Sequence, residues 1–232
     1  VNLIRSHAAG CGDALSPSEC ERVGERVAKD INAHWRARFQ EEHGVESFME
    51  IQFETHFLQL YMPTKRGSSE GSKKRYAGWV KTEDGHDAVI KGLEAVRTDW
   101  TPMARTFQRE LLRRVFSSEF GELAEWVQAT ADDVRSGRRD SALVYTKRMR
   151  RAPEDYKKNI PPHVRAALLL GGTPRRISYV VTVKGPQPVS MQTAALDYDH
   201  YLSHQLLPAG EGILKMVGID LKAFTSVQMQ LL

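Results

Sequence analysis

The sequence predicts an α+β protein in which a helix and antiparallel strands come first and a mainly helical part follows. Two observations support this prediction. Apolar residues recur every four positions between residues 16 and 39 and then alternate with other residues between 47 and 62. After Asp99 the helical period returns and dominates. We therefore expect two subdomains with a boundary near Asp99, and 232 residues suffice for a core in each.

The first expected element is a helix with clear start signals. Ser16 can cap it, Pro17 fits its first turn, and Glu19 stands three positions after Ser16, as in a capping box. The apolar residues at a spacing of four are Val23, Val27, Ile31, Trp35 and Phe39. They predict a helix with one apolar face.

Strands are predicted next. Residues 47–62, SFMEIQFETHFLQLYM, are rich in aromatic and branched side chains and predict one or two strands. Residues 62–74 have the composition of a Gly/Ser/Lys loop. The runs RYAGWVKT and DAVIKG stand on either side of Glu83-Asp84-Gly85 and predict a β-hairpin.

Helices are predicted for most of the second half. Apolar side chains fall on one helical face over residues 102–116, and a second helix is expected over 120–135. The stretch 141–159 is mixed and basic. No element is assigned to that stretch.

Pro161-Pro162 predicts the start of a short helix, and residues 176–183 predict a strand. A last helix over 198–218 is expected to be kinked or broken at Pro208. The tail, residues 223–232, is expected to be flexible.

Composition excludes several classes of protein. No apolar run approaches the roughly 18 residues of a membrane span, and the first residues lack a signal-peptide pattern. Cys11 and Cys20 stand nine positions apart without a second pair, which argues against a zinc site. Reduced thiols and a cytoplasmic location are the expectation.

Positive charge is concentrated in one window. Residues 135–176 hold twelve Lys or Arg and three Asp or Glu, although the whole chain has a net charge of only +4. A second focus, residues 65–75, holds five cations and one acid. Such asymmetry is typical of a surface that binds a polyanion. The alternative is a solvated basic face with no ligand.

Five motifs follow one another along the chain, and their order is more specific than any one of them. They are GSKKRYAGWV, IKGLEAVRTDWTPMARTFQRELLRRVF, DYKKNIPPHVRAA, ISYVVT with GPQPV, and LDYDHYLSHQLLPAGEGIL. In this order they resemble the C-terminal part of family B DNA polymerases, and the bacterial DNA polymerase II group is the most similar. The resemblance implies a partial palm over residues 1–98, a mainly helical thumb over 99–222 and a tail over 223–232.

The same resemblance implies which residues contact DNA. A palm and thumb hold primer–template duplex by its backbone, which calls for cations and amides rather than base-specific readers. The KKRY run of the family contacts the primer end and the minor groove, where acceptors are shared by all base pairs. The implied DNA-binding residues are Lys73, Lys74, Arg75, Tyr76, Lys91, Lys147, Arg148, Arg150, Tyr156, His163 and Arg165.

Structural alternatives remain open for several of these residues. Lys73 and Lys74 can be merely solvated, and Tyr76 can pack rather than bind. For Lys91, a contact with DNA and a side chain that is merely solvated are equally expected. His163 can equally be a satisfied histidine at a helix start.

Structural roles are expected for other residues of the matched motifs. Trp100 is expected in the core, and Arg97 with Asp99 is expected to form an ion pair. His200 and His204 have a spacing that can bind zinc, but no Glu follows His200 as in the zinc-protease motif. We therefore predict no metal site in this chain.

The catalytic carboxylates of the family are not in this sequence. Family B polymerases carry them in a D..SLYP segment and a DTDS hairpin, and neither motif occurs here. Mg²⁺ is thus expected only in a complete polymerase active site, where two acidic ligands hold two ions. As part of a nucleotidyltransferase, this chain is not expected to extend a primer alone.

The last residues suggest a protein partner. The ending QMQLL fits a short pattern by which bacterial polymerases dock to the sliding clamp, and it implies Gln228, Met229, Leu231 and Leu232 as contact residues. The rest of the polymerase, as a separate chain, is a second possible partner. Exposed apolar surface is expected where missing palm strands would lie. The alternatives are a stand-alone DNA-binding or clamp-associated module and a non-functional polymerase remnant.

Overall fold

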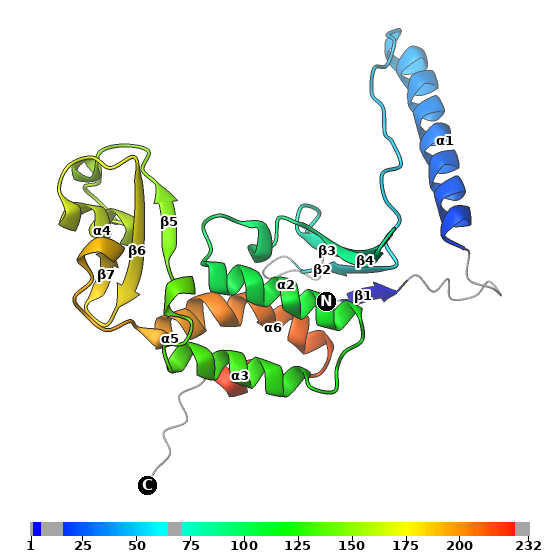
Figure 1. Cartoon of the computed structure of the whole chain (residues 1–232). Helices are drawn as coiled ribbons and strands as arrows, with labels where there is room; N and C mark the ends of the chain where they lie inside the picture. Colours follow the sequence, from blue (N-terminus) through cyan, green and yellow to red (C-terminus); the bar gives the residue numbers. More distant parts are fainter. Residues whose placement is uncertain (1, 6–15, 65–70, 226–232) are drawn as a thin grey trace. The chain divides into compact units, whose positions relative to one another are not determined.

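The structure is a computed structural model that describes residues 2–5, 16–64 and 71–225 (Figure 1). The chain divides into two compact units. One consists of Val1–Leu3, Tyr61–Ala77 and Ala88–Leu232, and the other of Ile4–Leu60 and Gly78–Asp87. We call them the large unit and the small unit. Helices and antiparallel strands both occur, which agrees with the predicted α+β class.

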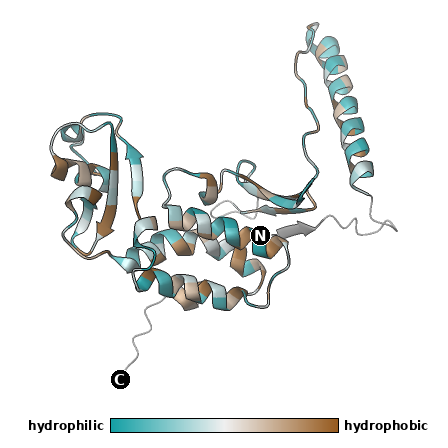
Figure 2. Ribbon diagram, in the orientation of Figure 1, coloured by the Kyte–Doolittle hydropathy of each residue, from teal (hydrophilic) through white to brown (hydrophobic). Residues whose placement is uncertain are grey.

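Helix α1 (Pro17–His43) belongs to the small unit and begins as predicted. The Ser16 hydroxyl accepts a hydrogen bond from the Glu19 amide, and the Ser16 amide donates to the Glu19 carboxylate at 2.8 Å. Both halves of the capping box are therefore present. Figure 2 shows that most of α1 is hydrophilic.

The prediction of strands throughout 47–62 was wrong for most of this stretch. Only β2 (Gln59–Met62) is a strand. Farther upstream, the Asn32 side chain of α1 forms the two main-chain hydrogen bonds that a neighbouring strand would otherwise form. Its amide nitrogen donates to the Ile51 carbonyl at 2.8 Å, and its oxygen accepts from the Ile51 amide at 2.9 Å. The main-chain groups of Ile51 are therefore satisfied without a ladder.

Strands β1 (Asn2–Arg5), β2, β3 (Tyr76–Thr82) and β4 (Gly85–Lys91) form a four-stranded sheet in this order. The strands β3 and β4 are joined at Glu83-Asp84, so the predicted hairpin is confirmed.

The core of the large unit is helical. Helix α2 (Pro102–Phe116) packs on α6 (Leu207–Met216), and α3 (Leu123–Arg135) lies against α5 (Tyr198–Tyr201) and α7 (Lys222–Thr225). Its fully buried side chains include Leu111, Leu112, Leu123, Leu206, Ile213 and Leu214. Within the described part of the chain, no helix is long and apolar enough to cross a membrane.

The last long helical stretch, expected to be kinked or broken at Pro208, continues through this residue without a break. A π-helix (Leu202–Leu206) follows α5 and leads directly into α6, whose first turn contains Pro208. The π-helix carries Gln205, whose side-chain oxygen accepts hydrogen bonds from the amide and the hydroxyl of Thr101, each at 3.0 Å.

The second half is mainly helical, as expected, and it also contains a second, three-stranded sheet. Strands β5 (Tyr145–Arg148), β6 (Arg176–Thr182) and β7 (Gly185–Pro188) are antiparallel in that order. Helix α4 (Pro162–Leu170) packs against β6 and β7. We call β5 to β7 with α4 the sheet lobe (Figure 1).

Strand β5 could not be recognised in the sequence because it lies at the edge of this sheet. Among the described residues its only strand partner is β6, so most of its side chains remain in contact with water and are polar. Short 3₁₀ segments complete the fold: Glu94–Val96, Asp140–Ala142, Pro153–Asp155 and Val189–Met191.

Candidate nucleic-acid interface

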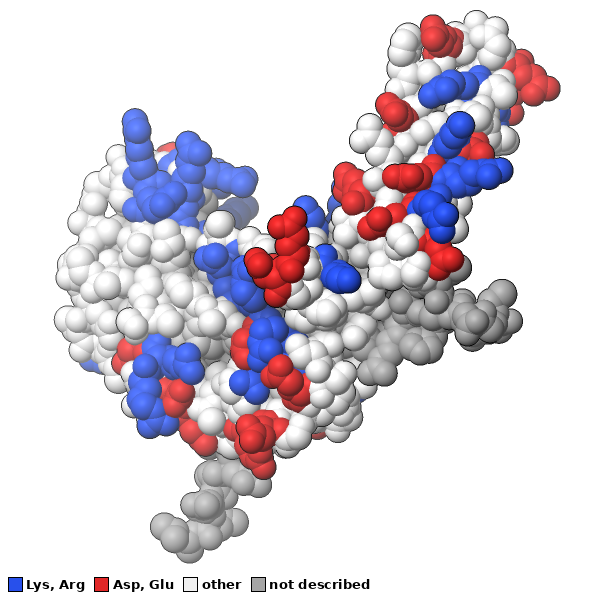
Figure 3. Space-filling view, turned by 45° about the vertical axis from the view of Figure 1, so that its right-hand side comes forward, with Lys and Arg blue, Asp and Glu red and all other residues white. Residues whose placement is uncertain are grey.

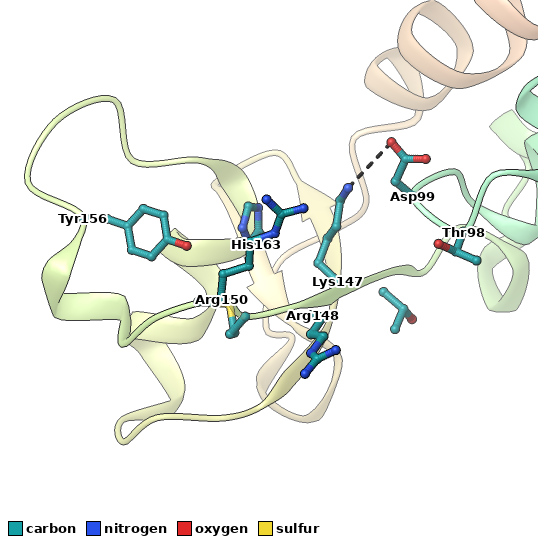
Figure 4. A pocket seen from close by; sticks show the side chains of 9 residues that line it. Thr98, Asp99, Lys147, Arg148, Arg150, Tyr156 and His163 are labelled. Atoms are coloured by element: carbon teal, nitrogen blue, oxygen red, sulfur yellow. Dashed lines mark ion pairs between the residues drawn. The ribbon is translucent and has the colours of Figure 1, made fainter. Parts of the chain in front are cut away.

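An open cleft of about 720 Å³ lies within the large unit, where the sheet lobe meets the segment that precedes α2 (Figure 4). It is lined by Thr98, Asp99, Thr146, Lys147, Arg148, Met149, Arg150, Tyr156 and His163. Five of these nine residues were predicted from the sequence to bind DNA. The fold therefore brings together side chains that lie up to 65 positions apart, from Thr98 to His163.

The edge strand β5 positions the cations of the cleft. Lys147 stands opposite Ile177 and Arg148 opposite Arg176 in the antiparallel register. The pairing continues past the end of the strand, because the Met149 amide donates to the Arg175 carbonyl at 3.0 Å. Met149 is buried, whereas Arg148 and Arg150 on either side of it are exposed. The alternation of a strand thus directs these two guanidinium groups to solvent.

One carboxylate lies in this basic cleft. Arg97 donates to Asp99 from Nε at 3.0 Å and from Nη2 at 2.8 Å, so the predicted ion pair is found. The same carboxylate lies 3.6 Å from Lys147 Nζ. Hydrogen bonds from Arg97 hold the pKa of Asp99 below its ordinary value; burial opposes this shift and Lys147 adds to it. Trp100, expected in the core, is only half-buried.

The other side of the cleft carries aromatic rings. Figure 4 shows the Tyr156 hydroxyl pointing toward His163, the second residue of α4. Arg151, which the sequence had not singled out, lies over the Tyr156 ring with its guanidinium carbon 4.2 Å from the ring centroid. Burial, with repulsion from Lys147 as a second cause, lowers the pKa of His163. Both causes favour the neutral form of His163 in the free protein.

The structure divides the predicted basic window into two parts. At its beginning, Arg135 pairs with Asp132, and both Arg138 and Arg139 pair with Asp133. The remaining cations of the window, apart from Lys147, form no ion pair with any described residue. They are Arg148, Arg150, Arg151, Lys157, Lys158, Arg165, Arg175 and Arg176. The uncompensated charge therefore belongs to the sheet lobe and its connections. Figure 3 shows such a gathering of Lys and Arg, whereas both signs are interspersed along α1.

Other predicted DNA-binding residues do not line the cleft. Arg165 is exposed on α4, and Lys91 is exposed at the end of β4. Lys73 and Lys74 are exposed in a turn before β3, and Tyr76 is half-buried at the start of that strand. The Arg75 guanidinium is engaged by the Glu94 carboxylate. The predicted clamp contacts Gln228, Met229, Leu231 and Leu232 lie outside the described residues.

The two histidines with zinc-like spacing are engaged in other contacts. His200 Nε2 lies 2.9 Å from the Tyr145 hydroxyl, and His204 Nδ1 lies 2.8 Å from the Ser203 hydroxyl. Over residues 2–5, 16–64 and 71–225, no group of three His, Cys, Asp or Glu is placed to hold a metal ion. These residues therefore do not fit the Mg²⁺ pair of a polymerase active site.

The comparisons with known proteins agree on one family. The family model described as DNA polymerase family B matches residues 19–217. The chain therefore belongs to DNA polymerase family B.

Among its relatives, DNA polymerase II of Escherichia coli is 44% identical over 216 residues, which cover 88% of this chain and 27% of that protein. This similarity confirms the resemblance seen in the motifs. A DNA polymerase of Methanocaldococcus jannaschii is 30% identical over 74% of this chain and 11% of its own length. DNA polymerase 2 of Aeropyrum pernix is 32% identical over 65% of this chain and 20% of its own length. The chain thus spans well under a third of each of these relatives.

Proposed function

We propose that this chain is the palm-and-thumb part of a DNA polymerase II-like enzyme and that it holds primer–template duplex by its backbone. The observation that carries the proposal is the separation of paired from unpaired cations. Arg138 and Arg139 already have a carboxylate partner in Asp133. Arg148 and Arg150 at the cleft are exposed, form no ion pair with the described residues and are available for phosphates.

The chemistry of the cleft is suited to a nucleic-acid backbone rather than to a base sequence. Lys and Arg neutralise phosphates and release counterions, and this contribution does not depend on sequence. The hydroxyl of Thr146 and that of Tyr156 add neutral donors beside these cations. We therefore propose that Lys147, Arg148, Arg150, Tyr156 and His163 contact successive phosphates of the duplex.

The rest of a polymerase is proposed as the partner of the small unit. Val23 and Val27 on α1 keep 51% and 50% of their surfaces exposed, and Phe48 keeps 89%. Exposed apolar side chains of this size are typical of a surface that another part of a protein covers. In a complete polymerase the acidic Mg²⁺ ligands would come from that other part. Clamp binding through the last residues, a cytoplasmic location and a role in replication and repair remain proposals.

A DNA-binding measurement tests the proposal directly. Fluorescence anisotropy of a labelled duplex of mixed sequence is followed over a range of salt concentrations. The variant R148A/R150A/R165A removes three unpaired cations, and R135A/R138A/R139A removes three paired ones from the same window. Both variants change the net charge equally.

The salt slope is the steepness with which the logarithm of the affinity falls as the logarithm of the salt concentration rises. We expect the first variant to reduce this slope by up to about 3, since one phosphate contact contributes about 1. The matched control should retain most of the slope. Absence of binding at low salt, binding that does not respond to salt, or equal losses in both variants would contradict the proposal.

A further inference from the structure

The exposed lysine pair Lys73-Lys74 stands at the tip of a tight turn in the large unit. The Arg75 amide donates to the Ser72 carbonyl at 3.2 Å and closes the turn. The Ser72 amide donates to the Pro63 carbonyl at 2.8 Å and ties the turn to the chain after β2. Both lysine side chains are exposed and form no ion pair with the described residues. A mobile pair of cations would lose entropy on binding a polyanion, so its anchoring matters.

The first anchor of this turn is a buried polar network. Arg75 Nη2 pairs with Glu94 Oε1, and Glu94 Oε2 accepts from Gln108 Nε2 at 2.8 Å. Gln108 in turn accepts from the Ala95 amide at 2.6 Å and donates to the Ala209 carbonyl at 2.8 Å. Glu94 and Gln108 are only 6% and 2% exposed. The network therefore joins the turn to α2 and α6, the two central helices of the core.

The second anchor is a close backbone contact. The Lys74 carbonyl oxygen lies 2.2 Å from the position that a Cβ would occupy at Gly92. Gly92 also has a φ of +64°, which disfavours other residues. A larger residue at position 92 would displace the backbone of the turn. The positions of Lys73 and Lys74 are thus fixed from two sides.

A buried glutamate beside a cationic surface needs a reason, because its charge opposes the binding of a polyanion. Burial of an unpaired carboxylate is costly, and Glu94 is buried with Arg75 as its charged partner. The Glu94 carboxylate therefore neutralises the Arg75 charge within the protein. Arg75 is therefore poorly placed to be a phosphate ligand, although the KKRY motif suggested that role.

We propose that Glu94 is a positioning residue for DNA binding: through Arg75 it fixes the Lys73-Lys74 turn, so that the two lysines and not Arg75 contact the duplex. This inference rests on the proposed function. It makes a prediction opposite to simple electrostatics. Loss of a negative charge near a polyanion normally strengthens binding, whereas loss of the Glu94 charge should weaken it by releasing the turn.

The test measures duplex affinity and its salt slope for E94Q in the 232-residue chain. The matched control is E122Q, which removes the same charge from an exposed residue without an ion pair among the described residues. We expect E94Q to bind roughly threefold to tenfold more weakly with a smaller salt slope. E122Q should bind as tightly as the wild type or slightly more tightly. Equal or tighter binding by E94Q would overturn the proposal.

A double-mutant cycle separates positioning from general damage to the fold. K73A/K74A should lower the salt slope by about 2 if both lysines contact phosphates. In the K73A/K74A background, E94Q should change the duplex affinity little further, because the two lysines through which Glu94 acts are already removed. A full additional loss would show that Glu94 acts elsewhere and would overturn the inference.

Circular dichroism and thermal unfolding check that E94Q is folded. If it is not, Q108M removes the hydrogen bond that Gln108 donates to Glu94, together with its bonds to Ala95 and Ala209, without altering any charge. The same weakening and the same dependence on Lys73 and Lys74 are expected of it. Unchanged binding by folded Q108M would count against the network. If the wild-type chain binds no duplex, the proposed function itself fails. If the wild type and K73A/K74A bind equally well, the lysine assignment fails.

Discussion

Lys147 Nζ lies 3.6 Å from the Asp99 carboxylate, which is already held by two hydrogen bonds from Arg97. The contact joins strand β5 of the sheet lobe to the segment that precedes α2. It also means that the Lys147 charge is partly neutralised in the free protein. A phosphate that enters the cleft must compete with Asp99 for this lysine.

Asp99→Asn tests this competition. We expect roughly twofold to fivefold tighter duplex binding and a salt slope larger by up to about 1, because Lys147 becomes available to a phosphate. D155N is a suitable control: it removes an exposed, unpaired acid of the same lobe but frees no lysine. Anisotropy titrations of the three proteins would show whether D99N gains more than D155N. A loss of affinity in D99N would mean that Asp99 serves mainly to orient Lys147.

The same substitution has an expected effect on stability and on its pH dependence. After allowance for solvent screening, loss of the Asp99 interactions should lower the free energy of unfolding by about 0.5–1 kcal/mol at neutral pH. The pKa of Asp99 is lowered in the folded state, so this stabilisation is present above its ordinary value of 3.8. It is lost as the pH falls below that value. Urea unfolding at several pH values should therefore show wild type and D99N converging in acid.

His163 predicts a proton-linked component of DNA binding. Burial and Lys147 lower its pKa below the ordinary value of 6.5, so protonation of the folded free protein is disfavoured. A bound phosphate would favour the protonated form and raise that pKa. The complex should then take up a proton, and affinity should rise as the pH falls from about 7.5 to about 5.5.

H163Q should flatten this pH profile. H204Q, which alters an exposed histidine outside the cleft, is the matched control and should retain the wild-type profile. Anisotropy at constant ionic strength across this pH range is the measurement. An unchanged profile in H163Q would show that His163 does not contact the phosphate and would favour its alternative role at the start of α4.

A substitution at Gly210 tests how tightly the helical core of the large unit is packed. A Cβ at this position would lie 2.7 Å from Phe107 Cε1 and 3.0 Å from Leu221 Cδ2. Gly210→Ala should therefore lower the free energy of unfolding by about 1–2 kcal/mol, even after the helix propensity that alanine adds. Gly121→Ala, with open space around its Cβ, should change stability little. Equal stability of both variants in urea would show that the core can relax.

Local signals predicted those elements whose causes are local. The Ser16–Glu19 capping box fixed the start of α1, and the hairpin at Glu83-Asp84 followed from the residues around it. The cleft could not be predicted as a cleft, since it depends on the pairing of Lys147 with Ile177 and on the approach of Lys147 to Asp99. Five of its nine lining residues were predicted, and only through the motifs. Composition likewise could not separate Arg138, which is paired, from Arg148, which is not.

The chain alone is expected not to extend a primer. Phosphoryl transfer at the primer end requires two Mg²⁺ ions held by carboxylates, and the described residues contain no cluster that could hold even one. The D..SLYP and DTDS motifs are also missing from the sequence. Purified chain should therefore bind labelled primer–template yet add no nucleotide when Mg²⁺ and all four deoxynucleotides are supplied. Binding must be shown in the same sample, so that a lack of extension is not simply a lack of DNA. Incorporation that co-purifies with the chain and disappears in R148A/R150A/R165A would contradict this prediction, because an unrelated contaminating polymerase would not respond to that variant.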